Sequence, residues 1–211
     1  MEGIILNNFY ICNQSVHLSN LQTVMLTSFS NFVRRYASGR NVLIFFVLQM
    51  IISAIILPYM QGKFDPTNTL GVLDLKFGFT PDEAYNMLKA YGEEGRKYYF
   101  FAEAVIDIVY PIIYTITNVL LLSYVFKKGF PANSFIQQLN IFPILATIGD
   151  FAENAGIIAM LNAFPERADN AASFASNAGM FKWIAFGTSI ALFLIGIVAW
   201  IIAVVKKKNF A

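Results

Sequence analysis

The chain has 211 residues, of which 57% are hydrophobic and only 13% are charged, and its mean hydropathy is +0.57. This composition excludes an ordinary soluble domain and indicates an integral membrane protein with several spans. The net charge of +2 comes from basic residues scattered over the ends of apolar runs, so nucleic acid is not an expected partner. The single cysteine, Cys12, and the single histidine, His17, exclude an intrachain disulfide and a Cys/His metal site.

Sequence motifs of the common enzyme classes are absent. The chain contains no H-E-x-x-H, P-loop, G-x-S-x-G or G-x-G-x-x-G pattern. We therefore expect no cofactor and no metal, and the sequence identifies no catalytic residue.

Residues 1–41 form an N-terminal segment that precedes the first apolar run. From Ser19 onward, apolar residues recur every three to four positions until Gly39, and Ser19 with Gln22 has the spacing of a capping box. We predict an amphipathic helix over about residues 19–38 that lies on the membrane surface, with its basic side chains near anionic headgroups. Packing of this helix on the rest of the protein or on a partner is the alternative.

Four apolar runs follow within a membrane domain that covers residues 42–205, and a basic tail occupies residues 206–211. Each run is long enough to cross a hydrocarbon layer of about 30 Å. The predicted fold is thus all-α, a bundle of four transmembrane helices. The predicted spans are residues 42–60, 98–126, 139–163 and 181–205.

The loop between the first two spans, residues 61–97, is the one substantial polar segment. Thr80, Pro81 and Glu83 have the pattern of a helix start, with a cap, proline at the first position and a capping-box glutamate. Gly92 is a predicted helix end. We expect residues 70–79 to form an ordered loop or a short extended piece that covers one end of the bundle.

The positive-inside rule gives the orientation. If there are four spans, the basic clusters at span ends all fall on one side, so both termini should be cytoplasmic and loop 61–97 extracytoplasmic. These clusters are Arg34, Arg35, Arg40, Lys127, Lys128, Lys206, Lys207 and Lys208.

Acidic residues inside the third span are the strongest functional signal. A carboxyl at mid-membrane costs roughly 2.5–3.5 kcal/mol on insertion scales and is rare unless it faces protein or water. Asp150, Glu153 and Asn154 share one helical face. These side chains therefore need partners on another helix.

The second span carries a matching polar face. Asp107, Tyr110, Tyr114 and Asn118 recur at three to four residues, with Glu103 one turn earlier. At a rise of about 1.5 Å per residue, Asp107 and Glu153 lie at similar depths. Pro111 also leaves the carbonyl of Asp107 without its usual helical partner. We predict a pocket between spans 2 and 3 that opens towards the outer loop.

Basic residues at the heads of the second and fourth spans are candidate counter-charges for these acids. The predicted ligand-binding residues are accordingly Asp107, Asp150, Glu153, Asn154, Tyr110, Tyr114, Asn118, Lys182 and Arg96.

Several functions are compatible with such a pocket. Our leading hypothesis is an integral membrane protein that binds a small amphipathic or lipid-like ligand there, with membrane lipids as its surroundings. The alternatives are an intramembrane acid–base enzyme acting on a lipid or isoprenoid, a proton-coupled carrier working as a dimer, and a packing or assembly subunit of a larger complex. The polar network can also serve packing alone.

A group of residues distributed over the membrane domain resembles a family of small bacterial membrane proteins with four spans. They are Leu73, Asp74, Gly78, Phe79, Thr80, Glu83, Ala84, Gly92, Gly95, Arg96, Tyr99, Asp107, Pro111, Tyr114, Asp150, Glu153 and Asn154. The resemblance covers roughly residues 40–205 and implies a location in the bacterial inner membrane.

In architecture alone, the chain is also similar to the four-helix fold of sterol isomerases and the sigma-2 receptor. In that fold, intramembrane acids beneath a large first loop bind amphipathic cations or sterols. No predicted span contains a histidine, so the resemblance does not extend to a sterol-isomerase proton relay.

Overall fold

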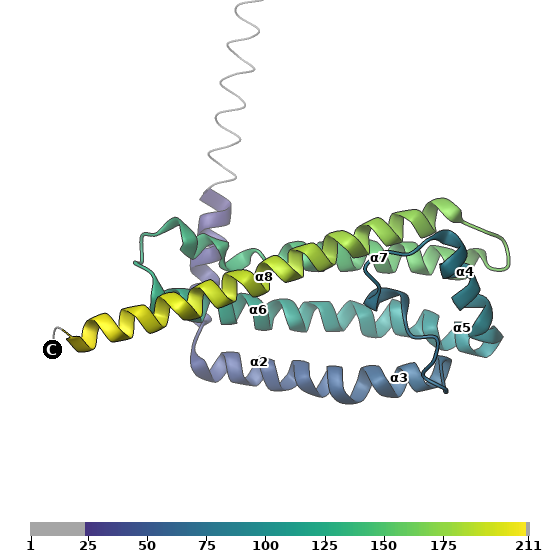
Figure 1. The fold of residues 1–211 in the computed structure, drawn as a ribbon, viewed down its shortest axis with the longest axis horizontal. Coiled ribbons are helices and arrows are strands. Elements are labelled where there is room, and N and C mark those ends of the chain that lie inside the picture. Colours follow the sequence, from purple (N-terminus) through teal and green to yellow (C-terminus); the bar gives the residue numbers. More distant parts are fainter. Residues whose placement is uncertain (1–23, 210–211) are drawn as a thin grey trace, which may run out of the picture.

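The computed structural model describes residues 24–209, and within this range the chain is helical with no strand (Figure 1). Four helices are long and apolar enough to cross a membrane. This confirms the prediction of an all-α membrane protein at that level. The four spans are Gly39–Phe64, Gly92–Gly129, Phe135–Ala163 and Asp169–Lys208.

The first two spans are each interrupted by one short π-helical segment. In span 1, α2 (Gly39–Ile51) and α3 (Leu57–Phe64) flank the π segment Ile52–Ile56. In span 2, the corresponding elements are α5 (Gly92–Phe101), the π segment Ala102–Ile106 and α6 (Asp107–Gly129). Single π turns inside α-helices often occur at functional sites, because they change which residues share a face.

Spans 3 and 4 are built differently. Span 3 begins with a 3₁₀ segment, Phe135–Ile141, and continues as α7 (Ile144–Ala163). Span 4 is the uninterrupted helix α8 (Asp169–Asn209). The fourth helix therefore begins at Asp169, twelve residues before the predicted start of the fourth span at residue 181.

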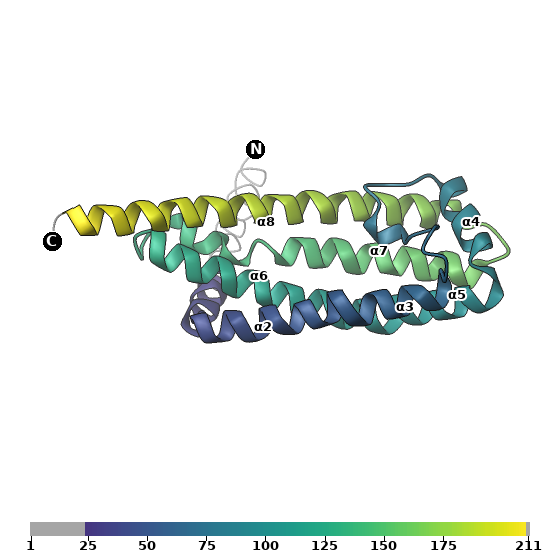
Figure 2. The same cartoon turned by 60° about the horizontal axis from the view of Figure 1, so that its bottom comes forward.

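Span 1 lies at one edge of the bundle. Figures 1 and 2 show α2 and α3 on the opposite side of α6 from α8. Only 6% of the most apolar stretch of span 1 is buried within the protein, compared with 50% for span 3. Span 1 packs mainly on span 2, whereas α8 packs on α7 and α6.

Helices α7 and α8 approach each other closely at glycines. A Cβ atom on Gly156 would lie 2.8 Å from the Cβ of Ala175, and one on Gly149 would lie 2.9 Å from the main-chain nitrogen of Lys182. Side chains larger than hydrogen would push the two backbones apart. The close approach brings the polar residues of α7 within reach of Lys182.

The outer loop is fixed at its start by Asp65, the residue after α3. Its buried carboxylate accepts hydrogen bonds from the main-chain amides of Thr69, Leu70 and Gly71. Burial raises the pKa of Asp65, but these amide hydrogen bonds and one from the Thr67 hydroxyl together outweigh it and lower the pKa. The loop therefore has a defined course although most of it is irregular.

The second half of the loop forms the predicted short helix, α4 (Pro81–Ala90). The Thr80 hydroxyl accepts from the amide of Glu83, and the Glu83 carboxylate accepts from the amide of Thr80, which confirms the capping box. Gly92, with φ of +69°, ends the turn after α4. Span 2 begins at Gly92, before the predicted start at residue 98.

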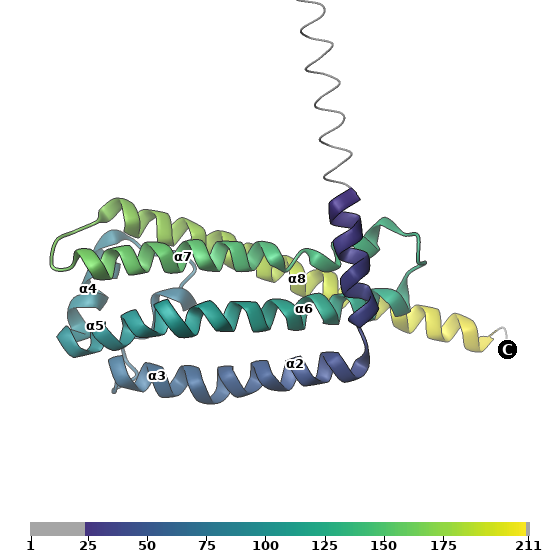
Figure 3. The same ribbon diagram turned by 180° about the vertical axis from the view of Figure 1, so that it is seen from behind.

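Residues 24–36 form a helix that runs across one end of the bundle (Figure 3). Its Ser30 is fully buried, and the Ser30 hydroxyl donates to the side-chain oxygen of Asn140, 2.7 Å away. The helix thus packs on the bundle, as in our alternative interpretation. Several of its apolar side chains, including Phe29 and Phe32, are exposed. Residues 19–23 of the predicted helix lie outside the described residues.

Candidate functional site

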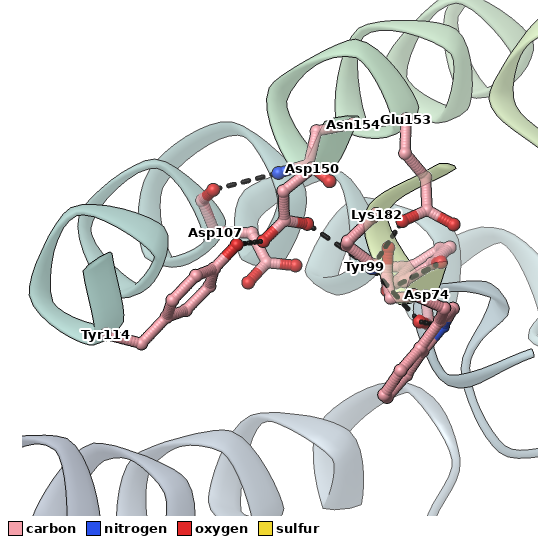
Figure 4. Close-up of polar contacts among 9 residues, drawn as sticks. Asp74, Tyr99, Asp107, Tyr114, Asp150, Glu153, Asn154 and Lys182 are labelled. Atoms are coloured by element: carbon pink, nitrogen blue, oxygen red, sulfur yellow. Dashed lines mark hydrogen bonds and ion pairs between the residues drawn. The ribbon is translucent and has the colours of Figure 1, made fainter. Parts of the chain in front are cut away.

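A chain of polar contacts links α6, α7 and α8 inside the bundle (Figure 4). The hydroxyl of Tyr114 donates to Asp150 Oδ2 over 2.8 Å, and Lys182 Nζ lies 3.3 Å from Asp150 Oδ1. Lys182 also forms an ion pair with Glu153, which is completely buried. One ammonium group therefore serves two carboxylates.

Asn154 supplies a hydrogen bond that Pro111 cannot make. Proline has no amide hydrogen, so the Asp107 carbonyl one turn earlier lacks its usual helical donor. Asn154 Nδ2 donates to that carbonyl over 2.8 Å. The side-chain amide of α7 thus replaces a backbone hydrogen bond of α6.

A second acidic group lies at the junction of the outer loop and span 2. Asp74, Glu103 and Asp107 each present a carboxylate oxygen, and these oxygens lie within 4.8 Å of one another. We call these three residues the carboxylate cluster. The hydroxyl of Tyr99 reaches Asp74 Oδ2 at 3.4 Å. None of the basic residues described here pairs with the cluster.

Two structural devices place the cluster. The π segment Ala102–Ile106 contains Glu103 and ends next to Asp107, so the wider turn brings both acids to one face. Asp74 is held by its main-chain carbonyl, which accepts from Lys182 Nζ at 3.1 Å and from Trp183 Nε1 at 3.2 Å. The backbone contacts leave the Asp74 carboxylate free to face span 2.

Both polar groups border one cavity of about 430 Å³. Its walls come mainly from spans 1, 2 and 4, with Val72, Asp74 and Leu75 of the outer loop at one side, and only Asp150 comes from span 3. The cavity therefore differs in position from the predicted pocket between spans 2 and 3, since most of its walls come from spans 1, 2 and 4. The size is typical of small-molecule sites.

The lining of the cavity combines apolar and acidic side chains. Leu57, Pro58 and Phe64 of span 1 face Trp183 and Phe186 of span 4 across it. Four acids, Asp74, Glu103, Asp107 and Asp150, line the same space, and Lys182 is the only basic residue among the described lining residues. The site thus has an excess of negative charge next to a hydrophobic wall.

Several buried oxygens of the site have no hydrogen-bond donor within the described residues. They are Asp74 Oδ1, Glu103 Oε2, Gln49 Oε1, Asn154 Oδ1 and both carboxylate oxygens of Glu153, which are served only by the Lys182 ion pair. Unpartnered buried acceptors cost roughly 1–3 kcal/mol each. A donor or a cation inside the cavity would satisfy those that face it.

Seven of the nine predicted site residues take part in this arrangement. Asp107, Asp150, Glu153, Asn154, Tyr114 and Lys182 belong to the networks above, and Tyr110 lines the cavity with its hydroxyl 2.8 Å from that of Ser53. The other two lie elsewhere.

Arg96 and Asn118 are not brought to the cavity. The Arg96 guanidinium donates to the carbonyl of Leu88 and lies 3.9 Å from the centre of the Phe164 ring, so its predicted role as a counter-charge is wrong. Asn118 Nδ2 donates to the carbonyl of Tyr114 within its own helix.

The sequence analysis missed several lining residues. Asp74 lies in a loop, where an acid is usually solvated, and Glu103 was seen on the polar face of span 2 but not assigned to the site. Gln49 and Ser53 are the polar residues of span 1, which faces the cavity. Polar residues are rare inside apolar spans, so Gln49 and Ser53 could have indicated that span 1 lines the site.

The comparisons with known proteins give no assignment. The chain matches no family model, no curated protein and no solved structure. The functional argument therefore rests on the geometry of the cavity and its side chains.

Proposed function

We propose that this protein is a membrane-embedded binding protein for a small amphipathic, lipid-like ligand. The ligand would place its polar end against the acidic side of the cavity and its apolar part between spans 1 and 4. The observation that carries this proposal is the cavity of about 430 Å³ with four acids and one lysine beside a hydrophobic wall.

The charge balance favours a ligand whose polar end donates hydrogen bonds or carries positive charge. Lys182 is already engaged by Asp150 and Glu153, so the carboxylate cluster keeps its acceptors free. An anionic head would add repulsion in a region of low dielectric constant. An ammonium or hydroxyl head would instead satisfy buried oxygens, and Trp183 offers an aromatic face.

We place the protein in the bacterial inner membrane with both termini in the cytoplasm. Basic residues at the end of the bundle that carries residues 24–36 support this orientation. The cavity then lies towards the outer leaflet, from which an amphipathic ligand can reach it without crossing the bilayer.

Tryptophan fluorescence can test the proposal directly. The chain has two tryptophans, and Trp183 lines the cavity while Trp200 packs on Tyr124. The Trp200→Phe variant in phosphatidylcholine vesicles therefore has one reporter. We expect dodecylamine to change its emission at the lowest concentration, dodecanol at a higher one and dodecanoate at none.

Substitution of a cavity acid should weaken this response. Hydrogen bonds to charged groups contribute about 1.5–3 kcal/mol, so Asp107→Asn should weaken dodecylamine binding about tenfold or more. Glu94→Gln, at an exposed acid of α5, is the matched control and should have no effect. Equal responses to the three head groups, or unchanged binding in both Asp107→Asn and Glu153→Gln, would reject the proposal.

A further inference from the structure

The carboxylate cluster has the composition of a site for a hard divalent cation. Asp74, Glu103 and Asp107 offer only oxygen ligands, and carboxylate oxygens are what Ca²⁺ and Mg²⁺ prefer. The three residues come from the outer loop and from both sides of the π-to-α junction in span 2. We propose that this cluster binds one Ca²⁺ ion.

The oxygens lie close enough together for one divalent cation to bind all three carboxylates. Three atoms separated by 4.8 Å, the upper limit found here, have a common centre about 2.8 Å from each, and shorter separations bring it closer. Carboxylate oxygens bind Ca²⁺ at about 2.3–2.6 Å but Mg²⁺ at about 2.0–2.1 Å. Ca²⁺ also accepts irregular coordination by several carboxylates and water molecules, whereas Mg²⁺ demands near-ideal octahedral geometry, so three carboxylates from a loop and a helix suit Ca²⁺ better.

Independent of the clustering, two of the three carboxylates each have an oxygen without a donor. Glu103 is 1% exposed, lines the cavity, and its Oε2 has no hydrogen-bond partner among the described residues. Asp74 is half-buried, but its Oδ1 atom is covered and also has no hydrogen-bond partner among the described residues. A buried carboxylate oxygen without a hydrogen-bond or ionic partner is energetically unfavourable. A cation bound in the cavity would supply the missing partner.

The surrounding residues hold the cluster ready for a cation. The bonds from Lys182 and Trp183 fix Asp74 through its main-chain carbonyl, and Oδ1 of its carboxylate has no partner among the described residues. The cavity supplies space for the water molecules that Ca²⁺ keeps when protein ligands number fewer than six to eight. Gln49 Oε1, a neutral and unpartnered oxygen, lines the same space.

The cation site extends the proposed function but does not depend on it. Calcium at the cluster would occupy the carboxylate oxygens that an ammonium head group would need, and so the two should compete for the same acids. Cation binding itself needs no organic ligand, and it can be measured on the protein alone.

Terbium luminescence provides the test, since Tb³⁺ replaces Ca²⁺ at oxygen sites and is excited by energy transfer from a nearby indole. The Trp183 indole nitrogen is 3.2 Å from the Asp74 carbonyl. We expect the purified full chain to sensitise Tb³⁺ emission, Ca²⁺ to displace Tb³⁺, and Mg²⁺ to do so only at much higher concentration. With excitation at wavelengths that indole absorbs and phenol does not, Trp183→Phe should abolish the emission, while Trp200→Phe should retain it.

Conservative variants of the ligands locate the site. Glu103→Gln and Asp74→Asn should each weaken Tb³⁺ and Ca²⁺ binding at least tenfold, whereas Glu94→Gln should bind as the native chain does. Calcium should also raise the Tm of the native chain and of Trp200→Phe, but not that of the two ligand variants. If Glu103→Gln does not fold, Asp74→Asn gives the same information, because its anchoring carbonyl is unchanged.

The outcomes separate this inference from the proposed function. Failure of the native chain to bind Tb³⁺ and Ca²⁺, or binding that survives in both ligand variants, overturns the calcium site. Dodecylamine binding without calcium binding rejects the calcium site alone. Calcium binding without any response to dodecylamine supports the site and rejects the amphiphile proposal.

Discussion

At the level of single residues, Pro111 and Asn154 form a complementary pair. Pro111 removes the amide that would bond to the Asp107 carbonyl, and Asn154 of α7 donates to that carbonyl over 2.8 Å. A buried carbonyl without a donor would be costly where no water is present. The pair therefore links the backbone of span 2 to a side chain of span 3 at the border of the cavity.

Removal of the asparagine amide should destabilise the protein in a way that depends on the proline. Asn154→Ala should lower the free energy of unfolding by about 1–3 kcal/mol, because the Asp107 carbonyl loses its donor. In a Pro111→Ala background the main chain regains an amide hydrogen that can bond to that carbonyl, so the same substitution should cost less. Unfolding of the four proteins in detergent, followed by circular dichroism, gives the coupling energy. Strictly additive effects would show that Asn154 does not compensate for the proline.

The polar residues of spans 2 and 3 were predictable from sequence, but their partners were less so. Because proline has no amide hydrogen, Pro111 predicted that the Asp107 carbonyl lacks its helical donor. Because a carboxyl inside a membrane is costly, Asp150 and Glu153 were predicted to need polar partners. Asp74 was not assigned, because the position of a loop acid depends on how the loop folds back. Arg96 was assigned wrongly, since its place near the head of span 2 did not reveal that it turns towards Phe164.

At the level of elements, the contact between α7 and α8 depends on small residues. Gly156 faces Ala175 and the carbonyl of Ala171 so closely that a Cβ atom would lie 2.8 and 2.9 Å from them. Small residues of this kind allow membrane helices to approach until their backbones almost touch. This contact holds Glu153 and Lys182 within ion-pair distance.

A methyl group at Gly156 should therefore weaken the pair of helices. Gly156→Ala forces α7 and α8 apart, and we expect it to lower the free energy of unfolding by about 1–3 kcal/mol. Gly187→Ala, also in α8, is the matched control, because a Cβ there has no described atom within 4 Å. Thermal unfolding of both variants in the same detergent checks this. A larger loss for Gly187→Ala would contradict the packing argument.

Helical elements could be predicted from apolar runs and caps, but not their interruptions. The Thr80 cap and the Gly92 end follow from local chemistry and appear as predicted. The π segments at Ile52–Ile56 and Ala102–Ile106 leave no pattern in an apolar sequence, because one extra residue per turn depends on the tertiary environment. These segments decide which residues of spans 1 and 2 face the cavity.

For the whole molecule, the distribution of basic residues predicts the orientation in the membrane. Cysteine labelling in intact cells can test it in a Cys12→Ser background, which removes the only native cysteine. Asn86→Cys, exposed in α4, should react with a membrane-impermeant maleimide. Asn133→Cys, exposed beyond the other end of α6, should react only after permeabilisation. The reverse labelling pattern would place the cavity towards the cytoplasm and contradict the proposed outer-leaflet access.

The number of membrane-length helices follows directly from hydropathy, whereas the cavity does not. Hydropathy registers how apolar a segment is, but the cavity results from packing: α7 lies against α8, and span 1 stands apart from α8 across α6. Two of the predicted acids, Asp107 and Asp150, therefore line the cavity, but most of its remaining wall comes from spans 1 and 4, which the polar pattern did not indicate.

The attachment of Asp74 to α8 determines which wall of the cavity can move. Because Lys182 and Trp183 both hold the Asp74 carbonyl, this stretch of loop and α8 behave as a single rigid wall. The opposite wall, α2 and α3, has little of its surface held by other helices. If the cavity binds a ligand as we propose, a bulkier ligand requires span 1 to move outward. Cross-linking span 1 to α6 should therefore reduce the range of ligand sizes that the cavity can bind.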